Sequence, residues 1–407
     1  MFAASSRDSR GAARQRILPT DDTPSLRQPL RDFSPPRLAD RTPPSEFSDL
    51  RVLIVHDWII AWGGAERTVE QMLTLFPRAR LVVGVLDQRK RDFNSTTRLA
   101  EETWLGRMPL ARHHHRWFLP LYPAAFASVN TEGYDLILSS CSAFSKSVRI
   151  EGGVPHLCYC YTPPRYLWDL QAEYGSRRSP AGLALSMAGP LLRAVDRNST
   201  KGVTRFVAIS HHIKDRIARA YGRDASVVYP PVRPKPASAA GVPRSAAYLS
   251  LGRLVPYKRV DLAILAANAV GARLIVAGDG PERARLEAIA GPSVSFLGEV
   301  SEEQAGNLME SCRAMIFCAE EDFGIAPLEA NAHGMPVIAF GRGAVRETMV
   351  EHRTSLFFEQ LSTASVGDAM QRLEHMEWSD AALRANAQRF LPERFRQELA
   401  SEARALL

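Results

Sequence analysis

The sequence predicts an α/β protein with two doubly wound, parallel-sheet domains in series. From Arg51 onward, short runs rich in Val and Ile alternate with longer helical patterns, which is typical of βαβ units. The alternation stops at the proline-rich segment Tyr229–Pro243 and then starts again. The length of 407 residues suits two or three domains that each bury a core. We therefore expect the two domains to face each other across a cleft at the carboxyl ends of their strands, where open α/β sheets bind ligands.

Short apolar runs predict the strands of both domains. In the first half these runs are Val52–Val55, Leu81–Val85, Leu136–Ser139, Leu157–Tyr159, Phe206–Ile209 and Val227–Tyr229. In the second half they are Ala247–Leu251, Leu274–Ala277, Val294–Leu297, Met315–Cys318 and Val337–Phe340. Between the last runs, Ser301–Gln304 has a capping-box pattern and predicts the start of a helix.

The same patterns give the domain boundaries. Because Tyr229–Pro243 is too rich in proline for a helix or a central strand, it predicts a linker. The first residues are rich in Arg and Pro with little apolar periodicity, which favours a disordered extension. The predicted organisation is an extension over 1–46, a first domain over 47–232, a linker over 233–246, a second domain over 247–380 and a helical segment over 381–407.

Composition and charge exclude several classes of protein. The net charge of +7 would suit nucleic acid, but no Lys/Arg run is interleaved with aromatic residues as in the usual recognition modules. The longest uncharged stretch, Trp117–Thr131, is too short for a membrane-spanning helix. No apolar segment of a secretory signal follows the first arginines. The cysteines lack zinc-site spacing and are too few for a disulfide framework, so we expect a cytoplasmic protein.

A first candidate site, Gly252–Lys258, follows a predicted strand. Gly252 lets the backbone turn close to a ligand, and the cations Arg253 and Lys258 can converge on one diphosphate. The alternative is a solvated loop with two surface charges. The nearby turn Gly278–Pro281 also follows a strand, but Arg283 stands where a dinucleotide fingerprint needs a third glycine. We predict that this turn is structural, with a nucleotide contact nearby left open.

A second candidate site is Glu321–Glu329. A strand ends there, Gly324 supplies a turn, and Pro327 fits the first turn of a helix that runs to about His333. The N–H groups at a helix start favour an anionic ligand, while Glu321 and Glu329 can accept hydrogen bonds from hydroxyl groups. The alternative is that both glutamates are exposed acids that only stabilise the helix start.

These motifs, in this order, resemble the second domain of retaining family-4 glycosyltransferases of the GT-B fold, which has two Rossmann-like domains. Ala208–Ser210 belongs to the same pattern, and Glu321 and Glu329 match the family's pair of glutamates separated by seven residues. In the first half, three motifs are similar to the branch of GDP-mannose-dependent α-mannosyltransferases. They are His56–Trp58, Gly63–Arg67 and Cys158–Asp169.

The resemblance implies a role for each residue on the donor side. Arg253 and Lys258 would neutralise the donor diphosphate, Glu321 would hold hydroxyl groups of the transferred sugar, and Glu329 would hold the ribose. The implied catalytic residues are Glu321, Arg253 and Lys258, and the implied donor-binding residues are Glu329, Phe323, Gly324, Ile325, Ala326, Gly63, Gly64 and Gly252. The final helical segment is expected to cross back to the first domain.

On the acceptor side, the resemblance points to His56, Asp57, Tyr161 and Arg165. Relatives commonly have His where this chain has Tyr161. Since the reference pKa of Tyr is about 10 and that of His about 6.5, Tyr161 is a poor general base at neutral pH. A retaining front-face reaction, in which the leaving phosphate helps to remove the acceptor proton, tolerates the change.

The expected reaction uses a nucleotide-sugar, GDP-mannose, as substrate, with no cofactor and no metal. Fixed cations and helix-end amides can stabilise the leaving diphosphate, and no acidic DxD triplet stands in the expected loop. The alternatives are a UDP-sugar or another GDP-sugar as donor, or a non-catalytic, glycosyltransferase-like partner protein.

The expected acceptor is a glycan or a lipid-linked saccharide, and no nucleic acid partner is expected. The segment Leu110–Tyr122 sets Arg112, Arg116 and three histidines beside aromatic residues, which suits peripheral contact with an anionic membrane surface. The alternative is that Trp117 and Phe118 belong to the core and that the cations are solvated.

Overall fold

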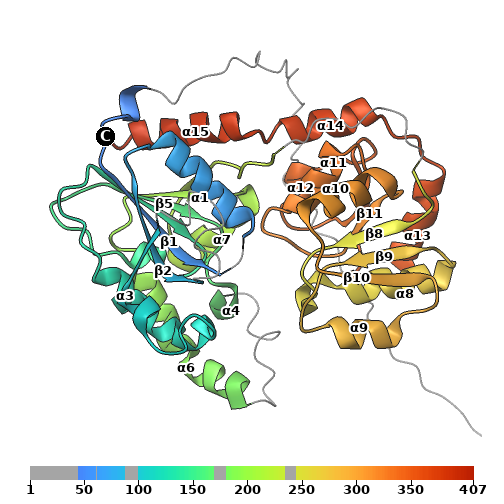
Figure 1. The fold of residues 1–407 in the computed structure, drawn as a ribbon, viewed down its shortest axis with the longest axis horizontal. Helices are drawn as coiled ribbons and strands as arrows, with labels where there is room; N and C mark the ends of the chain where they lie inside the picture. Colours follow the sequence, from blue (N-terminus) through green and yellow to red (C-terminus); the bar gives the residue numbers. More distant parts are fainter. Residues whose placement is uncertain (1–44, 61, 88–99, 169–179, 234–243) are drawn as a thin grey trace, which may run out of the picture. The chain divides into compact units, whose positions relative to one another are not determined.

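The computed structural model describes residues 45–60, 62–87, 100–168, 180–233 and 244–407. In this part of the chain, two parallel sheets are each covered by helices (Figure 1). The predicted extension, apart from its last two residues, and most of the predicted linker lie outside the described residues.

The first half forms a seven-stranded sheet in the order β3-β2-β1-β4-β5-β6-β7. Its strands are β1 (Val52–Ile59), β2 (Arg80–Leu86), β3 (Ala100–Glu102), β4 (Leu136–Cys141), β5 (His156–Cys160), β6 (Arg205–Ala208) and β7 (Ala225–Val227). Its helices and 3₁₀ turns are η1 (Ser45–Phe47), α1 (Gly64–Leu75), η3 (Trp104–Arg107), η4 (His115–Leu121), α3 (Tyr122–Ala127), η5 (Ser145–Ser147), α4 (Arg165–Trp168), α6 (Pro180–Asn198) and α7 (His211–Tyr221). The central strand β1 is buried along nearly its whole length, as expected of a parallel strand covered on both faces.

The second half forms a six-stranded sheet in the order β10-β9-β8-β11-β12-β13. Its strands are β8 (Tyr248–Leu251), β9 (Leu274–Ala277), β10 (Val294–Gly298), β11 (Met315–Phe317), β12 (Val337–Phe340) and β13 (Ser355–Phe358). Its helices are η6 (Pro256–Lys258), α8 (Val260–Val270), α9 (Arg283–Ile289), α10 (Glu302–Ser311), α11 (Ile325–Ala332), α12 (Val345–Thr348) and α13 (Thr363–Glu374). The capping box at the start of α10 is confirmed: Ser301 Oγ accepts from the Gln304 amide, and the Gln304 side chain accepts from the Ser301 amide.

Ten of the eleven predicted strands are present, and the predicted strand Val227–Tyr229 shares only Val227 with β7. In the described residues, two further strands were missed. The edge strand β3 contains Glu101 and Glu102, so it carries no apolar run. The second missed strand, β13, lies at an edge of the second sheet. Its sequence, SLFF, is apolar and could have been predicted as a strand. Ser45 and Glu46, which the sequence assigned to the extension, form η1 because Phe47 packs on Phe76 and Glu46 pairs with Arg404.

Each sheet has one point where the strand order reverses, between β1 and β4 in the first half and between β8 and β11 in the second. In open parallel sheets, ligands bind outside the carboxyl ends of the strands at such a point. The loop after β8 begins at Gly252, and the loop after β11 contains Glu321. The two candidate sites from the sequence are therefore neighbours in the fold.

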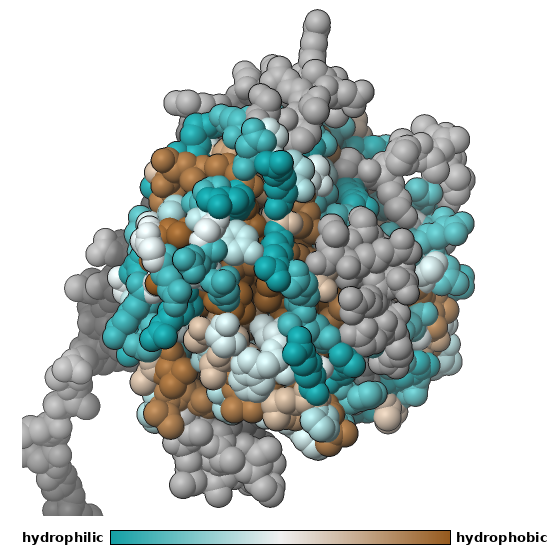
Figure 2. Space-filling model, turned by 60° about the vertical axis from the view of Figure 1, so that its left-hand side comes forward, coloured by the Kyte–Doolittle hydropathy of each residue, from teal (hydrophilic) through white to brown (hydrophobic). Residues whose placement is uncertain are grey.

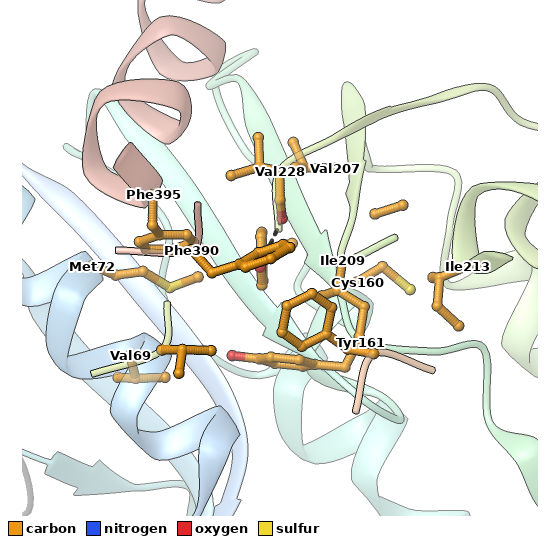
Figure 3. Packing of buried hydrophobic residues seen from close by; sticks show 14 of the residues in the cluster. Val69, Met72, Cys160, Tyr161, Val207, Ile209, Ile213, Val228, Phe390 and Phe395 are labelled. Carbon is orange, nitrogen blue, oxygen red and sulfur yellow. Dashed lines mark hydrogen bonds between the residues drawn. The ribbon is translucent and has the colours of Figure 1, made fainter. Parts of the chain in front are cut away.

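The predicted helical segment at the end of the chain is two helices, α14 (Asp380–Gln388) and α15 (Pro392–Arg404). They are separate because Pro392, which begins α15, cannot donate the amide hydrogen bond that would continue α14. Helix α14 packs on α11 of the second half, whereas α15 packs on α1 of the first. Phe395 of α15 is fully buried in the same cluster as Val69 and Met72 of α1 (Figure 3).

Candidate active site

The centre of the candidate site is an ion pair between Lys258 and Glu321. Strands β8 and β11 are paired neighbours, so the loops that follow them meet, and Lys258 Nζ contacts Glu321 Oε1. Both side chains are mostly buried, with 21% and 15% of their surface exposed. Lys258 Nζ also lies 5.4 Å from the centre of the Phe317 ring. The predicted cation and the predicted sugar-binding carboxylate are thus in direct contact.

The Gly252 loop is held from behind by the turn at Gly278–Pro281. A Cβ atom on Gly278 would lie 2.0 Å from the Gly252 carbonyl oxygen, and one on Gly280 would lie 2.2 Å from the Leu254 carbonyl oxygen. Only glycines allow two backbone segments to approach this closely. The turn therefore supports the loop that carries Arg253. Arg253 is exposed, and its carbonyl accepts a hydrogen bond from the Val255 amide at 3.0 Å.

Helix α11 begins beside this ion pair and starts two residues before Pro327. Its N-cap residue, Gly324, has a positive φ of 83° and provides no side-chain cap, so the first amides of α11 are available to an anionic ligand. The Phe323 side chain is not part of this surface. It is 3% exposed and packs between Tyr229 and Phe390, so only the backbone of Phe323 can face a donor.

The glycine-rich start of α1 packs against the start of α11. A Cβ atom on Gly64 would lie 2.2 Å from Ile325 Cδ1, so the absence of a side chain at Gly64 permits the contact. Arg67 of α1 pairs with Glu329 at 3.0 Å and also with Glu302. A small pocket at this junction is lined by Gly64, Arg67, Ile325 and Glu329, among others. The sequence motif Gly63–Arg67 contained Arg67, but its role was missed.

Asp57 holds the loop that follows β4. Its two carboxylate oxygens accept four backbone N–H groups, from Ser142, Ala143, Phe144 and Ser145, at 2.5–2.8 Å. A carboxylate that is 1% exposed and satisfied by four amides has a structural role. Asp57 was predicted as a candidate acceptor-side residue, and its geometry instead makes it a support of the sheet's carboxyl edge.

His56 and Tyr161 belong to one buried hydrogen-bond network below the glycine-rich loop. His56 Nδ1 lies 3.0 Å from Ser140 Oγ, and this Oγ lies 2.9 Å from the Tyr161 hydroxyl. The Tyr161 hydroxyl donates to the Ala65 carbonyl at 3.1 Å, and His56 Nε2 lies 3.8 Å from Glu66 Oε1. This network fixes the backbone around Gly63–Ala65 at the start of α1.

Charge and burial set the protonation of this network. Burial lowers the pKa of His56, but the carboxylates of Glu66 and Asp57 and a hydrogen bond with the Ser140 backbone together outweigh burial, so the pKa of His56 lies above its usual value. Burial raises the pKa of Tyr161 far above neutral pH. Tyr161 is therefore a neutral hydrogen-bonding group rather than a base.

Arg165 of α4 reaches the loop of Glu321 in the second half. Its guanidinium lies 4.8 Å from the centre of the Tyr257 ring, donates to the Glu320 carbonyl at 3.4 Å and lies 4.0 Å from Asp322. Asp322 also pairs with Arg216 of α7 at 2.5 Å. The sequence motif around Glu321 contained Asp322, but neither Asp322 nor Arg216 was singled out, because their contact joins distant parts of the chain.

Two family models match this chain, one in each half. Residues 62–235 match the model described as Glycosyltransferase Family 4, and residues 239–390 match the model described as Glycosyl transferases group 1. The chain belongs to the family 4 and group 1 glycosyltransferases. Among curated relatives, it is 30% identical over 215 residues to a GDP-mannose-dependent alpha-(1-6)-phosphatidylinositol monomannoside mannosyltransferase of Mycobacterium tuberculosis. This match covers 45% of the chain and 56% of the relative, so it spans little more than half of that protein.

Further similarities point the same way. A GDP-mannose-dependent alpha-mannosyltransferase of Mycobacterium tuberculosis is 36% identical over 107 residues, which is 26% of this chain and 28% of the relative. The fold is similar to Anabaena HepE in complex with UDP and glucose, with a TM-score of 0.63, 18% identity and coverage of 87% of this chain and 99% of that one. It is also similar to sucrose-phosphate synthase from Thermosynechococcus elongatus, with a TM-score of 0.67, 17% identity and coverage of 88% and 99%. These likenesses establish the GT-B fold.

The candidate site of this glycosyltransferase takes residues from both matched segments. The family 4 segment contributes Gly64 and Arg67, and the group 1 segment contributes Lys258, Glu321 and Glu329. In the described ranges, no group of three or more His, Cys, Asp or Glu side chains is placed to hold a metal ion, and no helix is long and apolar enough to cross a bilayer.

Proposed function

We propose that this glycosyltransferase transfers mannose from GDP-mannose to a glycan or lipid-linked saccharide, with retention of the anomeric configuration. The observation that carries the proposal is the contact between Lys258 and Glu321 beside the uncapped start of α11. A cation, a carboxylate and free helix amides in one place suit a ligand with a diphosphate next to a hydroxylated sugar.

The chemistry of transfer assigns a task to each of these groups. When the sugar–phosphate bond breaks, negative charge grows on the diphosphate and positive charge on the anomeric carbon. Lys258, Arg253 and the α11 amides would stabilise the diphosphate, while Glu321 would accept hydrogen bonds from the sugar hydroxyls. In the structure, Glu321 pairs with Lys258 and Glu329 pairs with Arg67. Donor binding would therefore exchange these ion pairs for contacts with the ligand.

Removal of the acceptor proton would fall to the leaving phosphate. Tyr161 is buried, hydrogen-bonded and neutral, so it supplies no base. A neutral Tyr161 favours a front-face reaction, in which attack and departure occur on the same side of the sugar and the configuration is retained.

The identity of the donor rests on relatives. The curated relatives are named as GDP-mannose-dependent enzymes, which supports GDP-mannose, whereas HepE was crystallised with UDP and glucose, which favours a UDP-sugar as the second candidate. Thermal unfolding with GDP, UDP and ADP and their sugars tests this choice. We expect stabilisation by GDP and GDP-mannose, and stabilisation by UDP alone would contradict the assignment.

The role of Glu321 separates an enzyme from a non-catalytic partner protein. We expect Glu321→Gln to abolish transfer of labelled mannose while the protein stays folded. Glu320→Gln is the matched control, because Glu320 is the neighbouring glutamate and its side chain is exposed. Equal transfer by both variants would contradict the assignment of Glu321.

The acceptor side of the proposal includes peripheral contact with an anionic membrane at the cytoplasmic face. The segment Trp104–Leu121 contains four exposed large hydrophobic side chains, Trp104, Leu110, Trp117 and Leu121, and no Asp or Glu. Trp117 is 72% exposed, so it is not a core residue as the alternative interpretation required, although Phe118 is partly buried. Figure 2 shows that the molecular surface carries hydrophobic patches among hydrophilic residues on the face that it views. The mixture of aromatic and basic residues in Trp104–Leu121 suits an anionic lipid surface.

Liposome flotation tests this contact. We expect the protein to float with vesicles that contain anionic lipid and Trp117→Ser to reduce the floating fraction. Leu297→Ser is the matched control, because Leu297 is 49% exposed but lies on β10 of the second half. Equal flotation of the two variants would contradict a membrane role for Trp117.

A further inference from the structure

The residue that follows Glu321 is held by three groups from the first half of the chain. Asp322 Oδ1 lies 2.5 Å from Arg216 Nη1, and Asp322 Oδ2 lies 4.0 Å from Arg165 Nη1. The Asp322 carbonyl accepts a hydrogen bond from Ser210 Oγ at 2.7 Å. Ser210 caps α7, Arg216 lies within α7 and Arg165 begins α4, so two separate elements converge on one residue.

The side chains that make these contacts are mostly buried. Arg216 is 4% exposed, Asp322 15% and Arg165 19%. An ion pair on the surface contributes little, but removing one partner of a buried pair leaves an uncompensated charge and is strongly destabilising. The carboxylate of Asp322 is therefore fixed to α7 rather than moving freely in solvent.

The backbone around Glu321 is fixed on both sides. Before it, the Glu320 carbonyl accepts from Arg165. At Glu321 itself, the carbonyl accepts from the Ala344 amide at 3.0 Å. After it, Asp322 is bound to Arg216 and Ser210, and the Phe323 ring is packed between aromatic rings. A shift of Asp322 would consequently move the Cα atom of Glu321 and its carboxylate relative to Lys258.

We propose that Asp322 is a positioning residue, through which Arg216 and Arg165 of the first domain hold the Glu321 carboxylate where it receives the sugar of the donor. This inference rests on the proposed function, because it gives Asp322 a role in the same transfer. It also means that the first domain, which is expected to bind the acceptor, sets the geometry of a donor-binding residue.

The test separates positioning from simple attachment of the two halves. Asp322→Asn keeps the size of the side chain but removes its charge, and Asp322→Glu restores the carboxylate. The matched control is Glu347→Gln, because Glu347 also bridges the halves by accepting from the His211 and His212 amides, at 2.8 Å each, and is not in the Glu321 loop. Initial rates of mannose transfer from GDP-mannose, with kcat and donor KM determined separately, and thermal unfolding are measured for each variant.

We expect Asp322→Asn to lower kcat by about 10- to 100-fold, because misplacing a reacting group by about 1 Å can cost on the order of 100-fold in rate. The donor KM should change less than about threefold, since Lys258 and the α11 amides remain for the diphosphate. Asp322→Glu should recover part of the lost kcat, and Glu347→Gln should lower thermal stability with little change in kcat. Equal kcat values for Asp322→Asn and Glu347→Gln would overturn the proposal.

A replacement variant and two parallel controls complete the test. If Asp322→Asn does not fold, Arg165→Gln takes its place. Arg165 is more exposed than Asp322, and its replacement leaves the pair between Asp322 and Arg216 intact. An unchanged kcat for Arg165→Gln would then overturn the proposal. Wild-type protein and Glu321→Gln are measured in parallel. Absence of transfer by the wild type would refute the proposed function, whereas an active wild type, an inactive Glu321→Gln and a fully active Asp322→Asn would refute only the positioning role.

Discussion

Replacement of Gly278 by alanine should damage the donor site without touching the donor. Gly278 has a positive φ of 130°, and a Cβ atom there would lie 2.0 Å from the Gly252 carbonyl oxygen, where ordinary contact begins at 3.4 Å. The Gly252 backbone would have to recede by about 1.4 Å, the difference between these two distances. Because Arg253 follows Gly252 directly, its guanidinium would move away from the diphosphate.

The loss of stability expected for Gly278→Ala has two separate sources. An L-residue at positive φ costs about 1–2 kcal/mol, and an extra carbon atom forced into packed structure costs about 1–3 kcal/mol. We therefore expect Gly278→Ala to lower the free energy of unfolding by about 2–5 kcal/mol, which leaves many domains folded. A displacement of about 1 Å at the loop should lower kcat/KM for the donor by about 10- to 100-fold.

The assay pairs this variant with Gly271→Ala. Gly271 also has a positive φ, of 70°, but no atom lies within 4 Å of its Cβ position. Denaturant unfolding should show a loss of only about 1 kcal/mol for Gly271→Ala, and its donor kcat/KM should stay at the wild-type value. If both variants lose the same stability and both keep wild-type kcat/KM, the argument that Gly278 supports the Gly252 loop is wrong.

Three further predictions concern stability and the reaction. Burial lowers the pKa of His156 to about 4, so the unfolded chain takes up a proton between pH 7 and pH 4 more readily than the folded one. Acidification over this range should cost the wild type about 3 kcal/mol more than His156→Gln, and parallel pH profiles of unfolding would refute this. Asp57→Asn should lower the free energy of unfolding by about 2–4 kcal/mol, because an amide cannot accept all four N–H groups that the carboxylate accepts; an unchanged melting temperature would argue against it. Transfer should continue in EDTA, and loss of turnover that magnesium or manganese restores would show that a metal ion takes part.

The sequence predicted most of the fold because its signals are local. Apolar runs such as Leu274–Ala277 become strands wherever helices cover both faces of a sheet, and the glycine and proline positions around Glu321 predict a turn followed by a helix. Strand β3 was missed because an edge strand with Glu101 and Glu102 has no apolar run.

The site was predicted less completely because its contacts join distant segments. The contact between Lys258 and Glu321 depends on the pairing of β8 with β11. The ion pair between Arg216 and Asp322 depends on contact between the two halves. For the same reason, no local pattern distinguishes Asp57 as the acceptor of four amides from an acid that faces a ligand. The loop that binds Asp57 lies far along the chain, after β4.

The path of the last two helices affects when the first domain can complete its core during synthesis. Because α15 packs on α1 and Phe395 fills a fully buried position beside Tyr159, the first domain is completed by residues that leave the ribosome after the second domain. Domains otherwise tend to fold from the N-terminus during synthesis. In this chain, the hydrophobic patch on α1 and β5 stays uncovered until the second domain has been translated. A fragment that ends at the linker should therefore expose this patch and aggregate, although it contains every strand of the first sheet.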